Sequence, residues 1–283
     1  MCVLLLGAYQ LHAAGSDEPA KPSSKDKPAT TTIDGKEIIT GSIKEPLALD
    51  MLKAYRKLKT YHAVWEMVPL AGQKNLKQKF LIETAYDKKT GSCMYKVQVH
   101  IKVKDKWQLY PFDKMTGTYL VVYEPNTLKV AYKMGAEPGT KETKFNDEKK
   151  FTYRDFRRSI MPFQPIDLPL MASKMPFQAI LQASLSNAKE TTEKIDKPKV
   201  RTLELFPTGG PTATAARLAV DSDKLLINRF SYFRPENNQT YMEMKRVSLT
   251  INKPLKVDIF DFDKQLASFK TTEKTEKAVS PAK

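Results

Sequence analysis

Apolar and polar residues alternate almost without a break in the stretch CMYKVQVHIKVK, residues 93–104. Every second residue from Tyr95 to Val103 is apolar, and the residues between them are Lys, Gln or His. Side chains of a β-strand point to opposite faces in turn, so this pattern predicts a strand with one apolar face and one hydrated, cationic face. The element that covers the apolar face is expected to bear on function.

Similar patterns recur along the chain and predict a mainly β protein. Short segments rich in Gly, Asp, Asn and Lys, such as 87–91 and 221–224, separate many of the apolar stretches, which is typical of an antiparallel meander. We expect about ten strands in one sheet, at 61–70, 78–87, 93–104, 117–125, 128–134, 199–207, 215–223, 225–235, 240–252 and 255–262.

Two segments have helical patterns. Residues 46–60 place Leu47, Met51, Leu52, Tyr55 and Leu58 on one side at spacings of three and four, with Lys53, Arg56, Lys57 and Lys59 on the other. Pro46 suits the first turn of that helix. Residues 151–192 contain prolines among Phe, Met, Ile and Leu, which predicts two short helices separated by proline-broken chain.

A sheet of this size exposes more apolar area than the helix at 46–60 can cover. We therefore expect a curved, antiparallel open half-barrel, with that helix and the segment 151–192 against its concave face. The segment 151–192 is rich in methionine, which packs against variable apolar partners, so we expect it to act as a lid. The alternative is a plug that never opens.

An apolar concavity that its own chain does not fill becomes a ligand cavity. Burial of an acyl chain gains roughly 0.8 kcal/mol per methylene, so such a site needs no polar motif. The expected cavity residues are Trp65, Met67, Phe80, Ile82, Val97, Val99, Val130 and Tyr132, and the expected lid contacts are Met171, Met175 and Phe177.

The ends of the chain differ from its middle. Residues 1–14 are apolar like a secretory signal, but no Lys or Arg precedes the apolar run, so we expect a truncated signal peptide and an exported protein of the periplasm or cell envelope. Residues 15–44 have the composition of a flexible linker. Residues 45–263 form the expected single domain, and residues 264–283 a polar tail.

Charge and composition limit the classes of function. Lys+Arg 47 against Asp+Glu 32 gives a net charge of +15, which favours contact with anionic surfaces such as membranes. The lysines are spread along the whole chain, so a solvated cationic surface is the simpler interpretation. Binding of nucleic acid is not expected, because the aromatic residues of the predicted strands point inward.

Catalytic chemistry is not indicated. With 3 His and 2 Cys, the chain offers few ligands for a metal, and we expect no metal, no cofactor and no catalytic residue. Neither a G-x-S-x-G motif nor a phosphate-binding loop is present. Asp258, Asp261 and Asp263 are interpreted as solvated strand residues rather than as a catalytic cluster.

The order of these features resembles the LolA-like superfamily, which includes periplasmic carriers of lipoproteins. The resemblance covers about residues 45–263 and is carried by LALDMLKAYRKLKTYHAVWEM near the start and LTINKPLKVDIFDFD near the end. It implies an unclosed barrel with helices as a lid over a hydrophobic cavity for acyl chains. Carriers of the best-known type place an arginine on an early strand to hold the lid, whereas residues 61–134 contain no arginine.

These observations predict a non-catalytic exported carrier that binds a hydrophobic ligand, such as an acyl chain or a lipoprotein, on the concave face. An alternative from the same sequence is an envelope protein that is structural or that binds a protein or an anionic polymer. Its core would be filled by its own helices and would hold no ligand.

Overall fold

The computed structural model describes residues 30–33, 36–39, 43–68, 78–104, 106–109, 118–133, 138–146, 167–171, 185, 187–191, 200–205 and 215–269. Statements about structure below concern these residues. The whole predicted signal peptide, residues 270–283 of the predicted polar tail and most of the segment 151–192 lie outside them.

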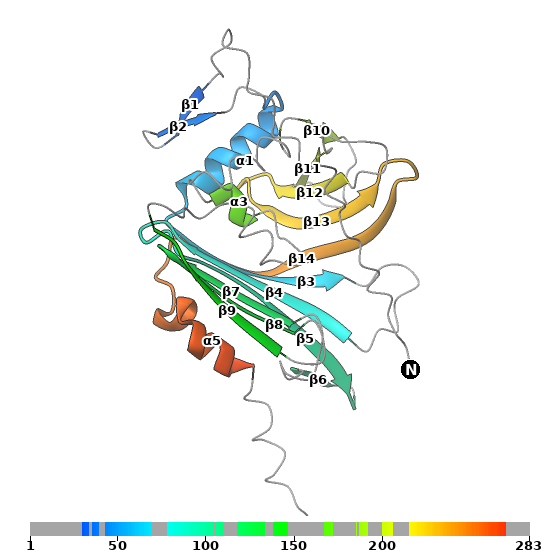
Figure 1. Ribbon diagram of the computed structural model, residues 1–283. Helices are drawn as coiled ribbons and strands as arrows, with labels where there is room; N and C mark the ends of the chain where they lie inside the picture. The colour runs from blue at the N-terminus through cyan, green and yellow to red at the C-terminus, as the bar shows by residue number, and fades with distance from the viewer. Residues whose placement is uncertain are drawn as a thin grey trace, which may run out of the picture.

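One antiparallel sheet of 12 strands forms the body of the protein (Figure 1). The strand order is β10-β11-β12-β13-β14-β3-β4-β5-β7-β8-β9, and β6 pairs with β5. The strands are β3 Thr60–Val68, β4 Gln78–Asp87, β5 Cys93–Val103, β6 Lys106–Leu109, β7 Thr118–Glu124, β8 Thr127–Lys133, β9 Pro138–Lys144, β10 Ala188–Thr191, β11 Val200–Leu205, β12 Ala215–Asp221, β13 Ile227–Arg234 and β14 Gln239–Ile251. The predicted class, an open antiparallel sheet, is confirmed.

The sheet consists of two meanders that meet in its middle. Strands β3 to β9 follow one another on one side, β10 to β14 on the other, and the long strand β14 pairs with β3. A hydrogen bond reinforces this junction. The Lys59 backbone N–H donates to the Asn252 side-chain oxygen at 2.8 Å. The strands at 106–109, 138–144 and 188–191 were not expected, since they are short or lack alternating apolar residues.

A separate two-stranded sheet lies within the expected linker. Strands β1 (Thr30–Ile33) and β2 (Lys36–Ile39) pair with each other in antiparallel fashion.

Helix α1 (Pro46–Lys57) has its expected position and ends three residues before the predicted boundary. The Glu45 carboxylate caps it by accepting the Leu47 N–H at 3.2 Å. Five residues at helical spacing are buried in the main core: Leu47, Ala48, Met51, Leu52 and Tyr55. Arg56, expected on the hydrated side, is only 4% exposed, because the short helix α3 (Asp167–Met171) packs beside it.

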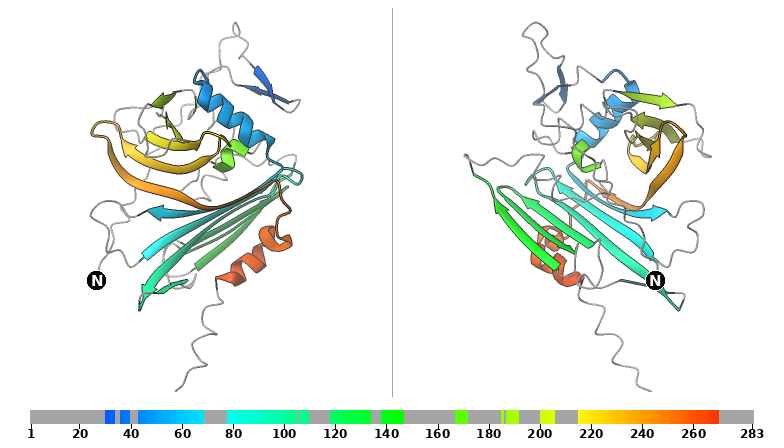
Figure 2. Two further views of the ribbon diagram at one scale, coloured as in Figure 1. Left: turned by 180° about the vertical axis from the view of Figure 1, so that it is seen from behind. Right: turned by 45° about the vertical axis from the view of Figure 1, so that its right-hand side comes forward.

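Helices cover both faces of the sheet. Helices α1 and α3 lie on the concave face, whereas α5 (Phe262–Ser268) lies on the opposite, convex face (Figure 2). The convex cluster contains Ile259 and Phe269 with five sheet residues, Ala85, Met94, Leu120, Val122 and Ala131. The packed chain therefore continues to Phe269, past the expected domain end at 263.

The strand expected at 255–262 is wrong. Its alternating residues form the 3-10 helix η2 (Val257–Phe260) and the start of α5. Asp261 caps α5 by accepting the Lys264 N–H at 3.0 Å, and Lys264 also contacts the Asp258 carboxylate at 2.7 Å. Aspartate is a good helix cap and a poor strand residue, and this local preference outweighs the alternation of residues 255–259.

The convex face is also less hydrated than the alternation in 93–104 predicted. Lys96 is 5% exposed, and its ammonium group donates to the side chains of Gln265 and Ser268 at 3.1 and 2.9 Å. It also lies 5.2 Å from the Phe269 ring centroid and 3.8 Å from a Glu83 carboxylate oxygen. Helix α5 therefore converts a predicted surface lysine into a buried contact.

This packing can be tested with a pair of substitutions in the C-terminal segment. Phe269 is fully buried and Val257 is 96% exposed. Phe269→Ala is expected to lower the free energy of unfolding by about 3–5 kcal/mol, because it leaves a cavity beside Lys96. Val257→Ala is expected to change it by less than about 0.5 kcal/mol. Urea unfolding measures both, and equal effects would contradict the packed arrangement.

Candidate functional site

Strand register aligns apolar side chains in rows across the concave face. Trp65 of β3 lies opposite Ile82 of β4, which lies opposite Val97 of β5. One step along the strands, Phe80 lies opposite Val99, and Met67 lies opposite Met244 of β14. The rows run across strands that are far apart in sequence, so the face is continuous only in the folded sheet.

All eight predicted cavity residues lie on this face. Trp65, Ile82, Val97, Val99 and Val130 are buried, whereas Met67, Phe80 and Tyr132 are half-buried at its margin. The Tyr132 ring extends across Gly139 of β9, where an added Cβ would come within 2.6 Å of the ring. Among the predicted lid residues, Met171 is buried in the same core, and Met175 and Phe177 lie outside the described residues.

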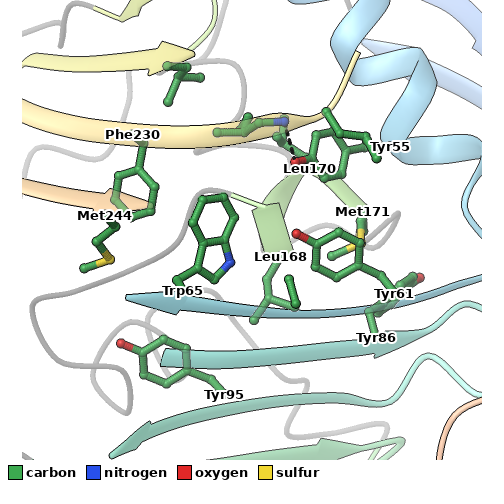
Figure 3. Close-up of a cluster of buried hydrophobic side chains, with 14 of the residues drawn as sticks. Tyr55, Tyr61, Trp65, Tyr86, Tyr95, Leu168, Leu170, Met171, Phe230 and Met244 are labelled. Carbon is green, nitrogen blue, oxygen red and sulfur yellow. Dashed lines mark hydrogen bonds between the residues drawn. The ribbon is translucent and has the colours of Figure 1, made fainter. Parts of the chain in front are cut away.

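Helix α3 occupies part of the concave face. Leu168, Leu170 and Met171 are all at most 3% exposed and belong to the same apolar cluster as Trp65. Figure 3 shows Leu168 between Trp65 and Tyr61, with Met171 beside Tyr61. This part of the face is covered by the protein's own side chains.

A buried carboxylate fixes α3 to the sheet. Oxygen Oδ2 of Asp167 accepts hydrogen bonds from the Tyr61 hydroxyl at 2.7 Å, the Thr84 hydroxyl at 3.0 Å and the Trp65 indole N–H at 3.2 Å. Oxygen Oδ1 accepts the Leu168 backbone N–H at 3.0 Å. The first three donors come from β3 and β4, so a single side chain connects the helix to two strands.

The protonation of this site follows from its burial. Burial raises the pKa of Asp167, and the hydrogen bonds from Tyr61, Thr84, Trp65 and Leu168 oppose that rise. Burial and the nearby Asp167 charge also raise the pKa of Tyr61 well above its usual value. Tyr61 therefore remains a neutral hydrogen-bond donor to the carboxylate.

Helix α1 is held to the other half of the sheet. The Tyr55 hydroxyl accepts the Ile227 backbone N–H of β13 at 3.1 Å (Figure 3). Arg246 of β14 donates to the Ile227 carbonyl, and its guanidinium lies 6.0 Å from the Trp65 ring centroid. Burial is the main cause that raises the pKa of Tyr55, so this hydroxyl also stays neutral.

Arg56 connects α1 to α3. Its Nη1 donates to the Met171 carbonyl at 3.3 Å, while Nε and Nη2 are buried without a hydrogen-bond partner within the described structure. Burial lowers the pKa of Arg56 to about 10, and its interaction with Tyr86 partly offsets that effect. The guanidinium is still cationic at neutral pH.

The sequence analysis did not single out Asp167 or Arg56. Asp167 is the acidic residue in the otherwise apolar and proline-rich stretch 160–171, and an acid in such a stretch is a usable signal. Arg56 gave no signal, because lysines surround it on the side of the helix that was expected to face water.

The side chains that pack on the concave face are mainly apolar. Cys93 is buried, and burial raises its pKa to about 12, so it remains a thiol. The described part of the chain contains no group of three His, Cys, Asp or Glu residues that could hold a metal ion. No helix among the described residues has the length and apolar character needed to cross a membrane.

The chain matches no protein-family model and no curated protein sequence. Similar solved structures include MucB of Pseudomonas aeruginosa in complex with MucA, at 10% identity and a TM-score of 0.39, with 77% of this chain and 59% of that chain covered. The chain thus spans about three fifths of the MucB chain.

Two further structures cover nearly the whole of their own chains. A DUF1329 family protein from Desulfovibrio piger ATCC 29098 has 14% identity and a TM-score of 0.35, with 77% of this chain and 95% of that chain covered. A domain assigned to an outer membrane lipoprotein-sorting protein from Vibrio parahaemolyticus has 12% identity and a TM-score of 0.30, with 80% and 98% covered. All three TM-scores lie below 0.5, so these similarities do not assign a function to this chain.

The arrangement of the sheet and its helices agrees with the unclosed barrel that the sequence resemblance to the LolA-like superfamily implied. An open antiparallel sheet carries α1 and α3 on its concave face. The arginine that the best-known carriers place on an early strand has no counterpart in the described parts of β3 to β8, and Asp167 and Arg56 make contacts between α3 and its neighbours here.

Removal of the Asp167 carboxylate tests its role. Asp167→Ala leaves four buried donors without this acceptor and is expected to lower the free energy of unfolding by about 3 kcal/mol. Asp50→Ala on α1 is the control, because the Asp50 side chain is 49% exposed and accepts a hydrogen bond from Lys53, three residues further along the same helix. Urea unfolding compares them, and a loss below about 0.5 kcal/mol for Asp167→Ala would contradict the proposed anchoring.

Proposed function

We propose that this protein is an exported, non-catalytic binding protein or carrier that holds an acyl chain or a lipid-like molecule on the concave face. The acyl chain can be free or part of a lipoprotein. One observation carries the proposal: the apolar face extends beyond the area that α1 and α3 cover. Met67, Phe80 and Tyr132 are half-buried there, next to the fully buried row that contains Trp65, Ile82 and Val97.

The half-buried residues supply a surface on which a ligand gains affinity by losing contact with water. An apolar group placed there removes water from side chains that the protein itself does not bury, at roughly 25 cal/mol per Å² of apolar area. Helix α3 is short, so a shift of α3 would extend this surface toward Trp65 and Tyr61. The bonds of Asp167 and Arg56 would set the cost of that shift.

A specific observation favours a second candidate function. Leu168, Leu170 and Met171 fill the concave face under α1, as expected for an envelope protein whose core is complete without a ligand. The two candidates differ in what the purified protein carries. A carrier is expected to release acyl lipids when it is denatured and extracted for mass spectrometry, whereas a protein with a self-filled core is not.

Binding to the concave face can be tested with two neighbouring residues of β4. Phe80 is half-buried on the concave face, and Leu81 is half-buried on the convex face. Phe80→Ala is expected to weaken binding of a fluorescent fatty acid about tenfold, because the removed ring contributes about 1.4 kcal/mol of apolar contact. Leu81→Ala is expected to leave the affinity within about twofold. Equal effects of the two substitutions, or a wild type that ignores the probe, would contradict the proposal.

We also propose that the β5–β6 hairpin contacts an anionic membrane surface. The hairpin lies at the end of the sheet away from α1 (Figure 1). Trp107 of β6 is 41% exposed, and Lys79 lies 5.0 Å from its ring centroid. Lys104 and Lys106 are exposed beside it. Tryptophan and lysine together favour the boundary between water and an anionic bilayer.

Vesicle binding tests this contact. Lys106→Ala is expected to weaken binding to phosphatidylglycerol-containing vesicles about fivefold, because a lysine near an anionic surface contributes about 1 kcal/mol. Lys224→Ala, in the exposed turn after β12, is the control and is expected to have no effect. Binding should also fall as salt rises. Equal binding to neutral phosphatidylcholine vesicles would contradict the membrane contact.

A further inference from the structure

Arg56 is a buried cation without a counter-charge among its described contacts. It is 4% exposed, and its hydrogen bond to the described chain goes to a neutral group, the Met171 carbonyl. Its Nε and Nη2 are buried and have no partner within the described structure. Buried charges are normally paired, because an unpaired charge away from water is costly. The fold therefore maintains a cation whose donors are not fully used.

The two unused nitrogens are the pair that binds an oxyanion side-on. The same protein shows this use at Arg201, whose Nε and Nη2 donate to the two oxygens of the Glu190 carboxylate at 2.7 and 2.6 Å. Arg217 directs the same two nitrogens at one oxygen of Glu204, at 2.9 and 2.6 Å. This two-point geometry suits carboxylate and phosphate oxygens. In Arg56 the same two donors are left for an oxyanion.

The surroundings of Arg56 favour an anion from outside the described chain. The Lys88 ammonium lies 2.8 Å from the Arg56 carbonyl oxygen, so a second cation stands next to this residue. The nearby acid of α3, Asp167, already accepts four hydrogen bonds from other groups. Lys88 is exposed, so its ammonium group adds positive charge at the surface beside the Arg56 backbone.

Position on the sheet relates Arg56 to the proposed ligand face. Arg56 interacts with Tyr86, which lies on the same face of β4 as Phe80. Tyr86 and Phe80 are six positions apart on β4, so the distance between them along the strand is roughly 20 Å at about 3.3 Å per residue. This span is comparable to an extended long acyl chain. Asp167 of α3 is bonded to Thr84 between these two residues, so a ligand along β4 would require the shift of α3 described above. It would then place one end near Arg56 and the other near the half-buried Phe80.

We propose that Arg56 binds the anionic headgroup, a carboxylate or a phosphate, of an amphiphile whose acyl chain lies on the concave face. This inference rests on the proposed function and specifies its ligand as an anionic amphiphile. Since the same guanidinium also donates to the Met171 carbonyl, headgroup binding is coupled to the position of α3.

The test compares ligands that share a chain and differ in charge. Oleate, oleyl phosphate and oleyl alcohol are titrated into the full, delipidated protein and into Arg56→Gln. Wild type is expected to bind at least one of the two anions tenfold or more tightly than the alcohol, and the preferred anion identifies the headgroup as carboxylate or phosphate. Arg56→Gln is expected to abolish the preference without changing the affinity for the alcohol.

Two control variants make the outcomes distinct. Arg201→Gln removes an exposed arginine that holds Glu190, and it is expected to retain the full preference. Arg56→Lys keeps the charge and loses the two-point geometry, so it is expected to retain only part of the preference. It also serves if Arg56→Gln does not fold, which circular dichroism shows. Equal wild-type affinity for anions and alcohol, or an undiminished preference in both Arg56 variants, would overturn the inference.

Failure of the proposed function gives a different result. If wild type binds none of the three lipids, the carrier function fails, and inorganic phosphate then decides the anion site. A phosphate-dependent rise in Tm that Arg56→Gln or Arg56→Lys diminishes would support an oxyanion site at Arg56. A rise that both variants retain, or no rise in wild type, would overturn it.

Discussion

The need to cover a large open sheet on both faces governs this structure. Its strands bear apolar side chains toward α1 and α3 on the concave face and toward η2 and α5 on the convex face. A closed barrel would bury its interior within itself, but an open sheet of 12 strands relies on other segments for cover. Among the described segments, the four helices α1, α3, η2 and α5 provide this cover, and they leave part of the concave face half-buried. The proposed ligand site is that remainder.

Each cover is attached through a buried charged side chain as well as through apolar contacts. Asp167 connects α3 to β3 and β4, Arg56 connects α1 to α3, and Lys96 connects β5 to α5. Buried ionisable groups are costly unless their hydrogen bonds are made. The described partners satisfy Asp167 with four donors and Lys96 with several groups, whereas two Arg56 nitrogens remain without partners. This difference separates a structural contact from a candidate binding group.

Much of the fold could be predicted from the sequence, and the reasons are local. Alternation located β4 at 78–87 to the residue, and it located β5 to within one residue. The spacing of Leu47, Met51 and Tyr55 located α1. Alternation along the strands also placed all eight cavity candidates on one face, since residues two apart on a strand share a face. Alternation failed at 255–262, where the helix-capping preference of Asp261 decided the structure.

The candidate site could be predicted only in its apolar part. A period of two assigns Trp65 and Ile82 to a face, but it does not say that Tyr61 and Thr84 point at a carboxylate 106 and 83 residues away. The same limit applies to Lys96 and Arg56, which have the pattern of surface residues. Whether such a residue is exposed depends on which later segment packs over it.

The sequence by itself determined the strand class, the helix α1 and the apolar face, because these follow from side-chain periodicity and local preference along a few consecutive residues. Only the tertiary structure decided that β14 pairs with β3, that α5 covers the convex face and that Asp167, Arg56 and Lys96 are buried. These outcomes depend on contacts between segments separated by many residues. The free energy of such contacts comes from packing and desolvation in the assembled fold, which no short stretch of sequence encodes.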